Sequence, residues 1–175
     1  MEWVRVGNAC FRSLFRARPW PGRGGPAGPV RGRLPAMSLS VDVYVPRAEG
    51  GIEVLDVPPE SSDVAGWERW RTEVWGSEPV RSLGARFFPR LAIEDLTVAP
   101  DEVSDFLAEC DLLRTHLARI ADHMTAEAEA AAETQAGTAS RKSHAEHADD
   151  VSRRLDNIVN AARRALGIGG GVIIW

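Results

Sequence analysis

All four histidines of this chain lie between residues 116 and 147, where they could supply metal ligands or proton-transfer groups. His116 and His123 are one heptad apart, and His144 and His147 are spaced i, i+3, so each pair shares a face if the segments are helical. Imidazoles on facing helices, with carboxylates beside them, build metal sites in helical bundles. The spacing matches neither H-E-x-x-H nor the Glu-x-x-His pairs of di-iron bundles. A metal-binding helical hairpin, as a protein or an enzyme that uses these histidines, is therefore our alternative hypothesis, with no metal ligand assigned.

Tryptophan and arginine are concentrated in a second stretch, residues 67–75. Both residue types are enriched at the hot spots of protein interfaces. Trp67 follows the helical spacing of the neighbouring valines, which favours a core position. We expect Trp70 or Trp75 to be exposed, and we assign both as candidate binding residues.

Two further arginines, Arg86 and Arg90, flank the sequence Phe87-Phe88-Pro89. An aromatic loop with an arginine on each side could be a surface recognition loop, or it could anchor itself in the core. We add Arg86 and Arg90 to the candidate binding residues. The predicted binding region is thus the segment from Trp67 to Arg90.

Signatures of known catalytic sites are absent from the sequence. It has no G-x-S-x-G, C-x-x-C, G-x-x-x-x-G-K-[ST] or helix-opening G-x-G-x-x-G motif. The glycine-rich run at 167–171 follows a predicted helix, the wrong order for a phosphate-binding loop. Cys110 occupies an apolar position, where burial would raise its pKa and make it a poor nucleophile. We therefore assign no catalytic residue and no cofactor, and we expect a non-enzymatic protein.

Two long helices are predicted to form the scaffold of the chain. Apolar residues from Val103 to Met124 follow an unbroken heptad pattern typical of a coiled coil, and a second seam runs from Ala148 to Ala165. Because a glycine-marked break near 136–137 lies midway, we predict an antiparallel hairpin of helices near 100–135 and 141–166. Ser143 and Glu146 form a predicted capping box, and Gly167 is the expected stop.

The strands are predicted near 39–45, 52–57 and 172–175, because these segments are rich in β-branched residues and bounded by Gly or Pro. A short helix is predicted near 63–75, and Leu96–Val98 is either a short strand or a lead into the long helix. A hairpin of strands followed by helices and a closing strand predicts an α+β fold with a small, mainly antiparallel sheet. Residues 37–175 are expected to form this single domain.

Residues 1–36 differ from the remainder in composition. They are rich in Pro and Gly and contain seven arginines against one glutamate, a net charge of +6, so residues 37–175 carry −10. We expect a disordered extension and Met37 as the native start, with a targeting or nucleic-acid-binding tail as the alternative. The acidic domain argues against a nucleic-acid partner, and no apolar run is long enough to span a membrane. Without a disulfide framework, a cytoplasmic location is expected.

The domain resembles small uncharacterised proteins of high-GC actinobacteria. The resemblance covers residues 37–175 and rests on Trp75-Gly76-Ser77, on Leu83-Gly84-Ala85-Arg86-Phe87 and on the Gly-Val-Ile-Ile-Trp ending. It implies no activity or site, but it agrees with a bacterial setting and a start at Met37. Our leading hypothesis is a protein-interaction module of the immunity or regulatory type, which binds an unidentified protein partner. Homodimerisation through an outer face of the helical hairpin is a further possibility.

Overall fold

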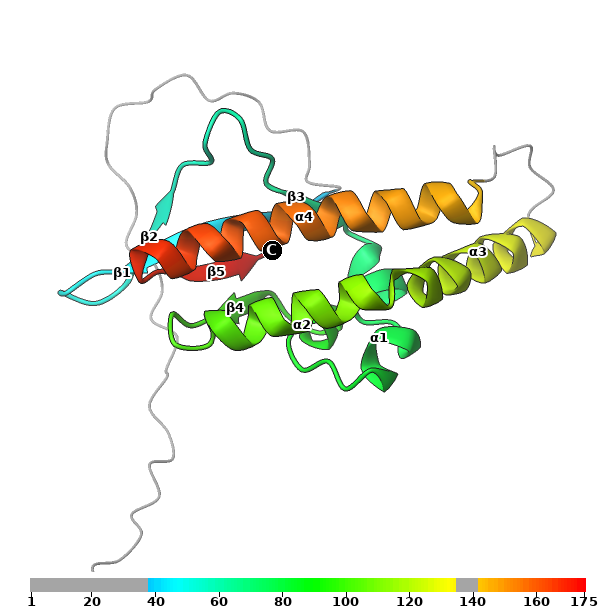
Figure 1. Ribbon diagram of the computed structural model, residues 1–175, viewed down its shortest axis with the longest axis horizontal. Coiled ribbons are helices and arrows are strands. Elements are labelled where there is room, and N and C mark those ends of the chain that lie inside the picture. Colours follow the sequence, from blue (N-terminus) through cyan, green and yellow to red (C-terminus); the bar gives the residue numbers. More distant parts are fainter. Residues whose placement is uncertain (1–37, 135–141) are drawn as a thin grey trace, which may run out of the picture. The chain divides into compact units, whose positions relative to one another are not determined.

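A computed structural model describes residues 38–134 and 142–175, which contain a five-stranded sheet and the helices that cover it (Figure 1). The extension 1–36 and the expected turn near 136–137 lie outside the described residues. The element order is β1 (Ser38–Pro46), β2 (Ile52–Leu55), β3 (Val64–Trp67), η1 (Arg71–Trp75), α1 (Glu78–Ser82), η2 (Phe88–Ala92), β4 (Leu96–Val98), α2 (Val103–Thr115), α3 (Leu117–Thr134), α4 (His144–Ile168) and β5 (Gly171–Ile174).

The sheet is antiparallel and is built around β1. Its order is β2-β1-β5-β4, and β3 pairs with the first residues of β1. The C-terminal strand inserts between β1 and β4, with Val43 opposite Val172 and Val98 opposite Val172 on the other side. All four residues of β5 are buried, so side chains on both of its faces are covered, which accounts for its non-alternating apolar sequence. The predicted α+β class and the three predicted strands are confirmed, and Leu96–Val98 is indeed a strand.

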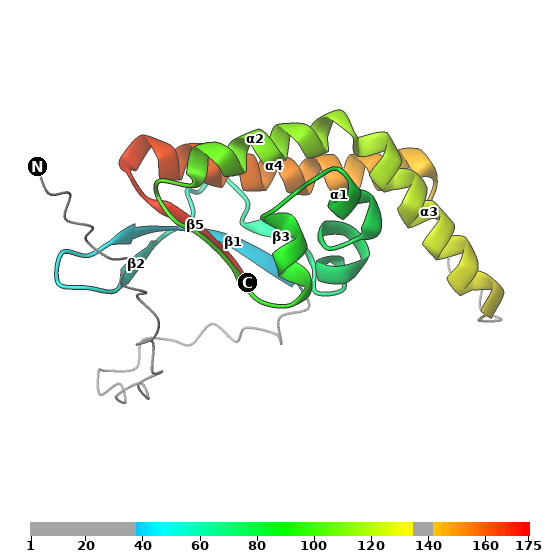
Figure 2. The same ribbon diagram turned by 90° about the horizontal axis from the view of Figure 1, so that it is seen from below.

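The helical hairpin is also present, but its first arm is two helices. The predicted single helix 100–135 breaks at His116, whose backbone (φ −111°, ψ 21°) is not helical. Its start also differs, because residues 99–102 form a turn and α2 begins at Val103. One distorted residue keeps the heptad spacing intact, so periodicity alone could not reveal the change in axis that separates α2 from α3 (Figure 2).

The second arm, α4, lies antiparallel to α2 and α3. Arg114 Nη2 lies 2.5 Å from Asp156 Oδ1, and His144 Nε2 lies 3.1 Å from Asp122 Oδ1, so the two arms run in opposite directions. The predicted capping box at Ser143 is confirmed. The helix passes Gly167 and ends at Gly169, which adopts the left-handed conformation (φ 66°) that a terminating residue needs.

The core fills the space between the sheet and the helices. In Figure 2, α2 and α4 lie on one side of the strands. Alternate residues of the strands face these helices. They are almost fully buried, and so are the residues on one apolar side of each helix. The strand and helix residues at the centre of this core are Leu39, Val41, Val43, Leu96, Val98, Val172, Ile174, Phe106, Cys110, Leu113, Ile120, Val151, Leu155, Ile158 and Ala162.

The segment predicted as a helix near 63–75 is not a helix over most of its length. Residues 64–67 form β3, and only 71–75 form a single π-helical turn, η1, that ends at Gly76. The helical spacing of Val64, Trp67 and Val74 was misleading, because only Val74 of these three lies in the core. Tertiary packing here overrides local periodicity.

Candidate functional site

Two of the predicted binding residues, Trp70 and Trp75, are core residues. Their exposed fractions are 2% and 0%, so the prediction that they are exposed anchors is wrong. The Trp75 indole donates a 3.0 Å hydrogen bond to the Ala65 carbonyl and packs 5.0 Å from the Phe88 ring. A buried indole needs such an acceptor, and here it ties η1 to β3. These tryptophans stabilise the fold and cannot reach a partner.

The other two, Arg86 and Arg90, are held in local surface ion pairs. Arg86 Nη2 lies 3.3 Å from Asp105 Oδ2, and Arg90 Nε lies 3.2 Å from Glu94 Oε1. Exposed pairs of this kind contribute little to stability. Because the two tryptophans are buried, the structure does not bring the four predicted residues together on one exposed patch.

A buried carboxylate that the sequence did not suggest organises the loop before η2. Glu109 of α2 accepts hydrogen bonds from the backbone N–H groups of Arg86, Phe87 and Phe88, at 2.6 to 3.1 Å. Three donors from consecutive residues satisfy both carboxylate oxygens, which is what a buried charge requires. Glu109 therefore positions the aromatic loop and is not free for chemistry.

The histidines do not form a metal cluster in residues 38–134 and 142–175. Within these ranges no three His, Cys, Asp or Glu side chains are placed to hold a metal ion together. His147 is buried beside a small cavity that Met124, Ala128 and Ala131 also line, and His144 faces Asp122 instead. The metal-binding alternative gains no support from this arrangement.

Cys110 is buried in the core, as its place in the seam predicted. Burial is the main cause that raises the pKa of its thiol far above the ordinary value, and the nearby Glu109 carboxylate adds to the effect. The thiolate is the reactive form of cysteine, so a buried thiol with a raised pKa is a poor nucleophile.

Tryptophans do reach the surface on the side of the sheet away from α2 and α4. Residues directly opposite one another in an antiparallel pair share a face, and alternate residues of one strand share a face. Trp67 is opposite Ser38 in the β3–β1 pair, and Trp175 exchanges backbone hydrogen bonds with Ser40. Both tryptophans thus belong to the face that the even-numbered residues of β1 define.

We call this surface the outer sheet face. The same registers place Val54 opposite Tyr44, Ile52 opposite Pro46, and Ile173 between Asp42 and Thr97. Four apolar side chains on it are exposed by nearly half: Trp67 46%, Trp175 45%, Ile52 49% and Val54 42%. The residues of the outer sheet face are Ser38, Ser40, Asp42, Tyr44, Pro46, Ile52, Val54, Trp67, Thr97, Ile173 and Trp175.

One polar contact orients the C-terminal tryptophan on this face. The Trp175 indole donates a 2.7 Å hydrogen bond to Asp42 Oδ2, across the β1–β5 pair. The indole is therefore held against the sheet with its apolar surface half exposed. Fixed aromatic side chains lose little conformational entropy on binding, which is why they serve well as anchors.

Part of this face was visible in the sequence. The sequence predicted a strand near residues 39–45, but nothing local indicated that Trp67 pairs with the same strand. The chain matches no protein-family model, no curated protein and no solved structure. The site therefore rests on geometry alone.

No helix in the described part of the chain is long and apolar enough to cross a membrane.

Proposed function

We propose that this protein is a non-enzymatic protein-interaction module that docks a partner protein on its outer sheet face. The observation that carries the proposal is the presence of two half-exposed tryptophans, Trp67 and Trp175, on one sheet face. Exposed apolar patches of this kind mark interaction sites, and tryptophan is the residue most enriched at their hot spots.

The remainder of the face suits the same role. Ile52 and Val54 extend the apolar surface along the β1–β2 hairpin, and Asp42 supplies a carboxylate near its centre. Residues 37–175 carry a net charge of −10, so a partner with an apolar patch and a basic rim is favoured. The proposed role is that of a cytoplasmic immunity-type or regulatory protein. Nucleic acid is not the proposed partner, because it carries the same sign of charge as this domain.

Affinity capture from the native host, with quantitative mass spectrometry, tests the proposal. The wild-type protein should retain a stoichiometric partner that the double variant Trp67→Ser/Trp175→Ser loses by tenfold or more. Ile93→Ser is the matched control, because Ile93 is 90% exposed but lies in the turn after η2, outside the outer sheet face. It should retain the partner at the wild-type level.

Two results would contradict the proposal. One is a partner that the double variant retains as well as the wild type; the other is the absence of any stoichiometric partner. Sedimentation at several concentrations distinguishes a second copy of this chain from a different protein. A dimer that the double variant abolishes would identify the partner as the chain itself.

A further inference from the structure

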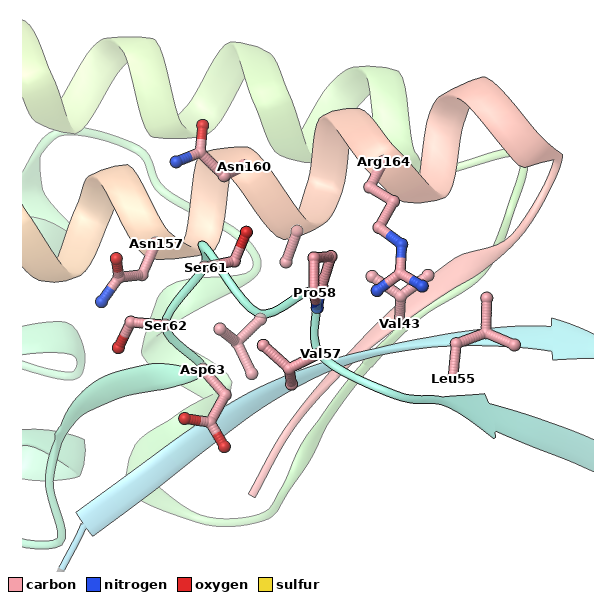
Figure 3. Close-up of a pocket in the computed structure, with 12 residues that line it drawn as sticks. Val43, Leu55, Val57, Pro58, Ser61, Ser62, Asp63, Asn157, Asn160 and Arg164 are labelled. Carbon is pink, nitrogen blue, oxygen red and sulfur yellow. The ribbon is translucent and has the colours of Figure 1, made fainter.

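A cavity of about 110 Å³ lies beneath α4, on the opposite side of β1 from the outer sheet face (Figure 3). One water molecule needs roughly 10–15 Å³ of such cavity volume, so the space would hold several waters or a small organic molecule. Its walls come from β1, from α4 and from the loop 56–63 that joins β2 to β3. The lining residues are Val41, Val43, Leu55, Val57, Pro58, Ser61, Ser62, Asp63, Asn157, Asn160, Ala161 and Arg164.

The cavity exists because two strands share one edge of β1 and leave a gap between them. β2 pairs with residues 43–46 and β3 with residues 38–40, so the connecting loop must leave the ladder and return. Pro58 and Pro59 cannot donate ladder hydrogen bonds, which keeps the loop away from β1. The loop rejoins the sheet where Val41 N–H donates to the Asp63 carbonyl at 2.7 Å.

Two side chains of α4 fasten this loop at both ends. Arg164 Nη1 donates to the Asp56 carbonyl at 2.8 Å, and Asn157 Nδ2 donates to the Val64 carbonyl at 2.9 Å. The walls are therefore held in place without a ligand. A preformed cavity binds a small molecule without the cost of ordering its own walls.

The chemistry of the lining is divided between an apolar floor and a polar rim. Val41, Val43 and Leu55 provide aliphatic surface. In Figure 3 the Arg164 guanidinium extends from α4 over Val43 and Pro58, whereas the Asp63 carboxylate points away from it on the other side of the loop. Asp63 is the one acidic side chain in the lining, so the guanidinium dominates the charge inside.

Arg164 keeps donors available for a ligand. Nη1 bonds the Asp56 carbonyl, which leaves the N–H groups of Nε and Nη2 unused within the described ranges. The Asn160 amide and the Ser61 hydroxyl, on the α4 and loop sides of the rim, add further donors. A planar guanidinium with neighbouring donors is the usual receptor for a carboxylate.

We infer that this cavity binds a small monocarboxylate with a short branched aliphatic body. The carboxylate would lie against Arg164, and the aliphatic body would cover Val41, Val43 and Leu55. This assignment does not depend on the proposed function, because the cavity and the outer sheet face lie on opposite sides of β1.

Titration of the ¹⁵N-labelled protein with 3-methylbutanoate, followed by NMR, tests the inference. We expect saturable shifts of the Asn157 and Asn160 side-chain amides, with a dissociation constant in the millimolar range or tighter. The neutral isostere 3-methylbutanamide should bind about tenfold more weakly or worse, because it cannot form the charge-assisted pair.

Variants separate the ligand site from nonspecific effects. Arg164→Gln should weaken binding about 10- to 100-fold. Arg163→Gln removes the same charge from an exposed neighbour and should leave binding within about twofold of the wild type, since a screened surface charge contributes little. Ala161→Leu fills the cavity while it retains Arg164, and it should also abolish binding.

Three results would overturn the inference. No saturable shift with 3-methylbutanoate would exclude the ligand class. Acetate that binds as tightly would indicate an adventitious ion only, because it has no aliphatic body. Undiminished binding by the Ala161→Leu variant would place the ligand elsewhere.

Discussion

The ring of Tyr44 occupies the space that a side chain on Gly171 would take. A Cβ atom built on Gly171 would lie 2.4 Å from Tyr44 Cζ and 2.4 Å from the Val98 carbonyl oxygen. The two residues are direct partners in the β1–β5 pair, and the phenol crosses β5 to donate a 3.2 Å hydrogen bond to Val98 in β4. One tyrosine thus ties three strands together because the middle strand has no side chain at this point.

Gly171→Ala should therefore lower the free energy of unfolding by roughly 1–3 kcal/mol, because the added methyl group displaces the ring and crowds a backbone carbonyl. Urea denaturation would measure the change. Gly167→Ala is the control: Gly167 lies within α4 with open space around its Cβ position, so that variant should gain about 0.5–1 kcal/mol. Equal effects of the two variants on the free energy of unfolding would show that the position of the Tyr44 ring does not require a glycine at residue 171.

Glu109 should contribute strongly to stability, because it accepts hydrogen bonds from three backbone N–H groups. Glu109→Ala leaves three backbone N–H groups of residues 86–88 without their acceptor. At roughly 1 kcal/mol or more for each unsatisfied donor, we expect a loss of at least about 3 kcal/mol in denaturant unfolding. Asp105→Ala breaks only the exposed pair with Arg86 and should cost below about 1 kcal/mol. A small effect of Glu109→Ala would mean that water replaces the carboxylate.

The scaffold was largely predictable because its signals are local. The capping box at Ser143, the heptad seams and the β-branched strand segments each depend on residues close in sequence, and the structure retains all of them. The break at His116 was not predictable, since one non-helical residue leaves the apolar spacing unchanged. Likewise Gly169, and not Gly167, ends α4, and either glycine satisfies the same sequence rule.

The candidate site was not predictable because its signals are long-range. Trp67 reaches the surface through pairing with Ser38, and Trp175 is oriented by Asp42, a residue from the other end of the domain. Glu109 acts on a loop more than twenty residues away, so its sequence neighbours give no indication of its role. Helical spacing assigned Trp67 to the core, but pairing with β1 places it on the outer sheet face. Trp75 was expected at the surface, but it is buried against Phe88 and hydrogen-bonded to Ala65.

These placements predict that two tryptophan substitutions lower the free energy of unfolding by very different amounts. Trp75→Ala should cost about 3–5 kcal/mol, because it empties a fully buried site and removes the hydrogen bond to Ala65. Trp67→Ala, at a half-exposed edge position, should cost below roughly 1 kcal/mol. Thermal or urea unfolding of both variants checks the prediction. A Trp67→Ala variant that unfolds as readily as Trp75→Ala would argue against the strand β3 placement.

The stability of the fold should decrease on mild acidification because of His147. This imidazole is only 8% exposed, and neither ring nitrogen has a hydrogen-bond partner within the described residues. Burial is the main cause that lowers its pKa, and Lys142 and Arg69 add to the effect, while Asp150 and Glu146 oppose it. Glu73 and Glu127 also line the adjacent cavity.

Because the folded-state pKa lies below the ordinary value of 6.5, the unfolded chain takes up a proton at His147 first as the pH falls. The stability that the fold gains by keeping His147 neutral is fully present above the unfolded-state pKa. It is lost as the pH falls toward the folded-state pKa. We expect the free energy of unfolding to be smaller at about pH 5 than at about pH 7.5, and His147→Gln to reduce that difference. His123→Gln, a matched change on the facing helix α3, should retain it. An unchanged pH dependence in His147→Gln would show that other groups control acid stability.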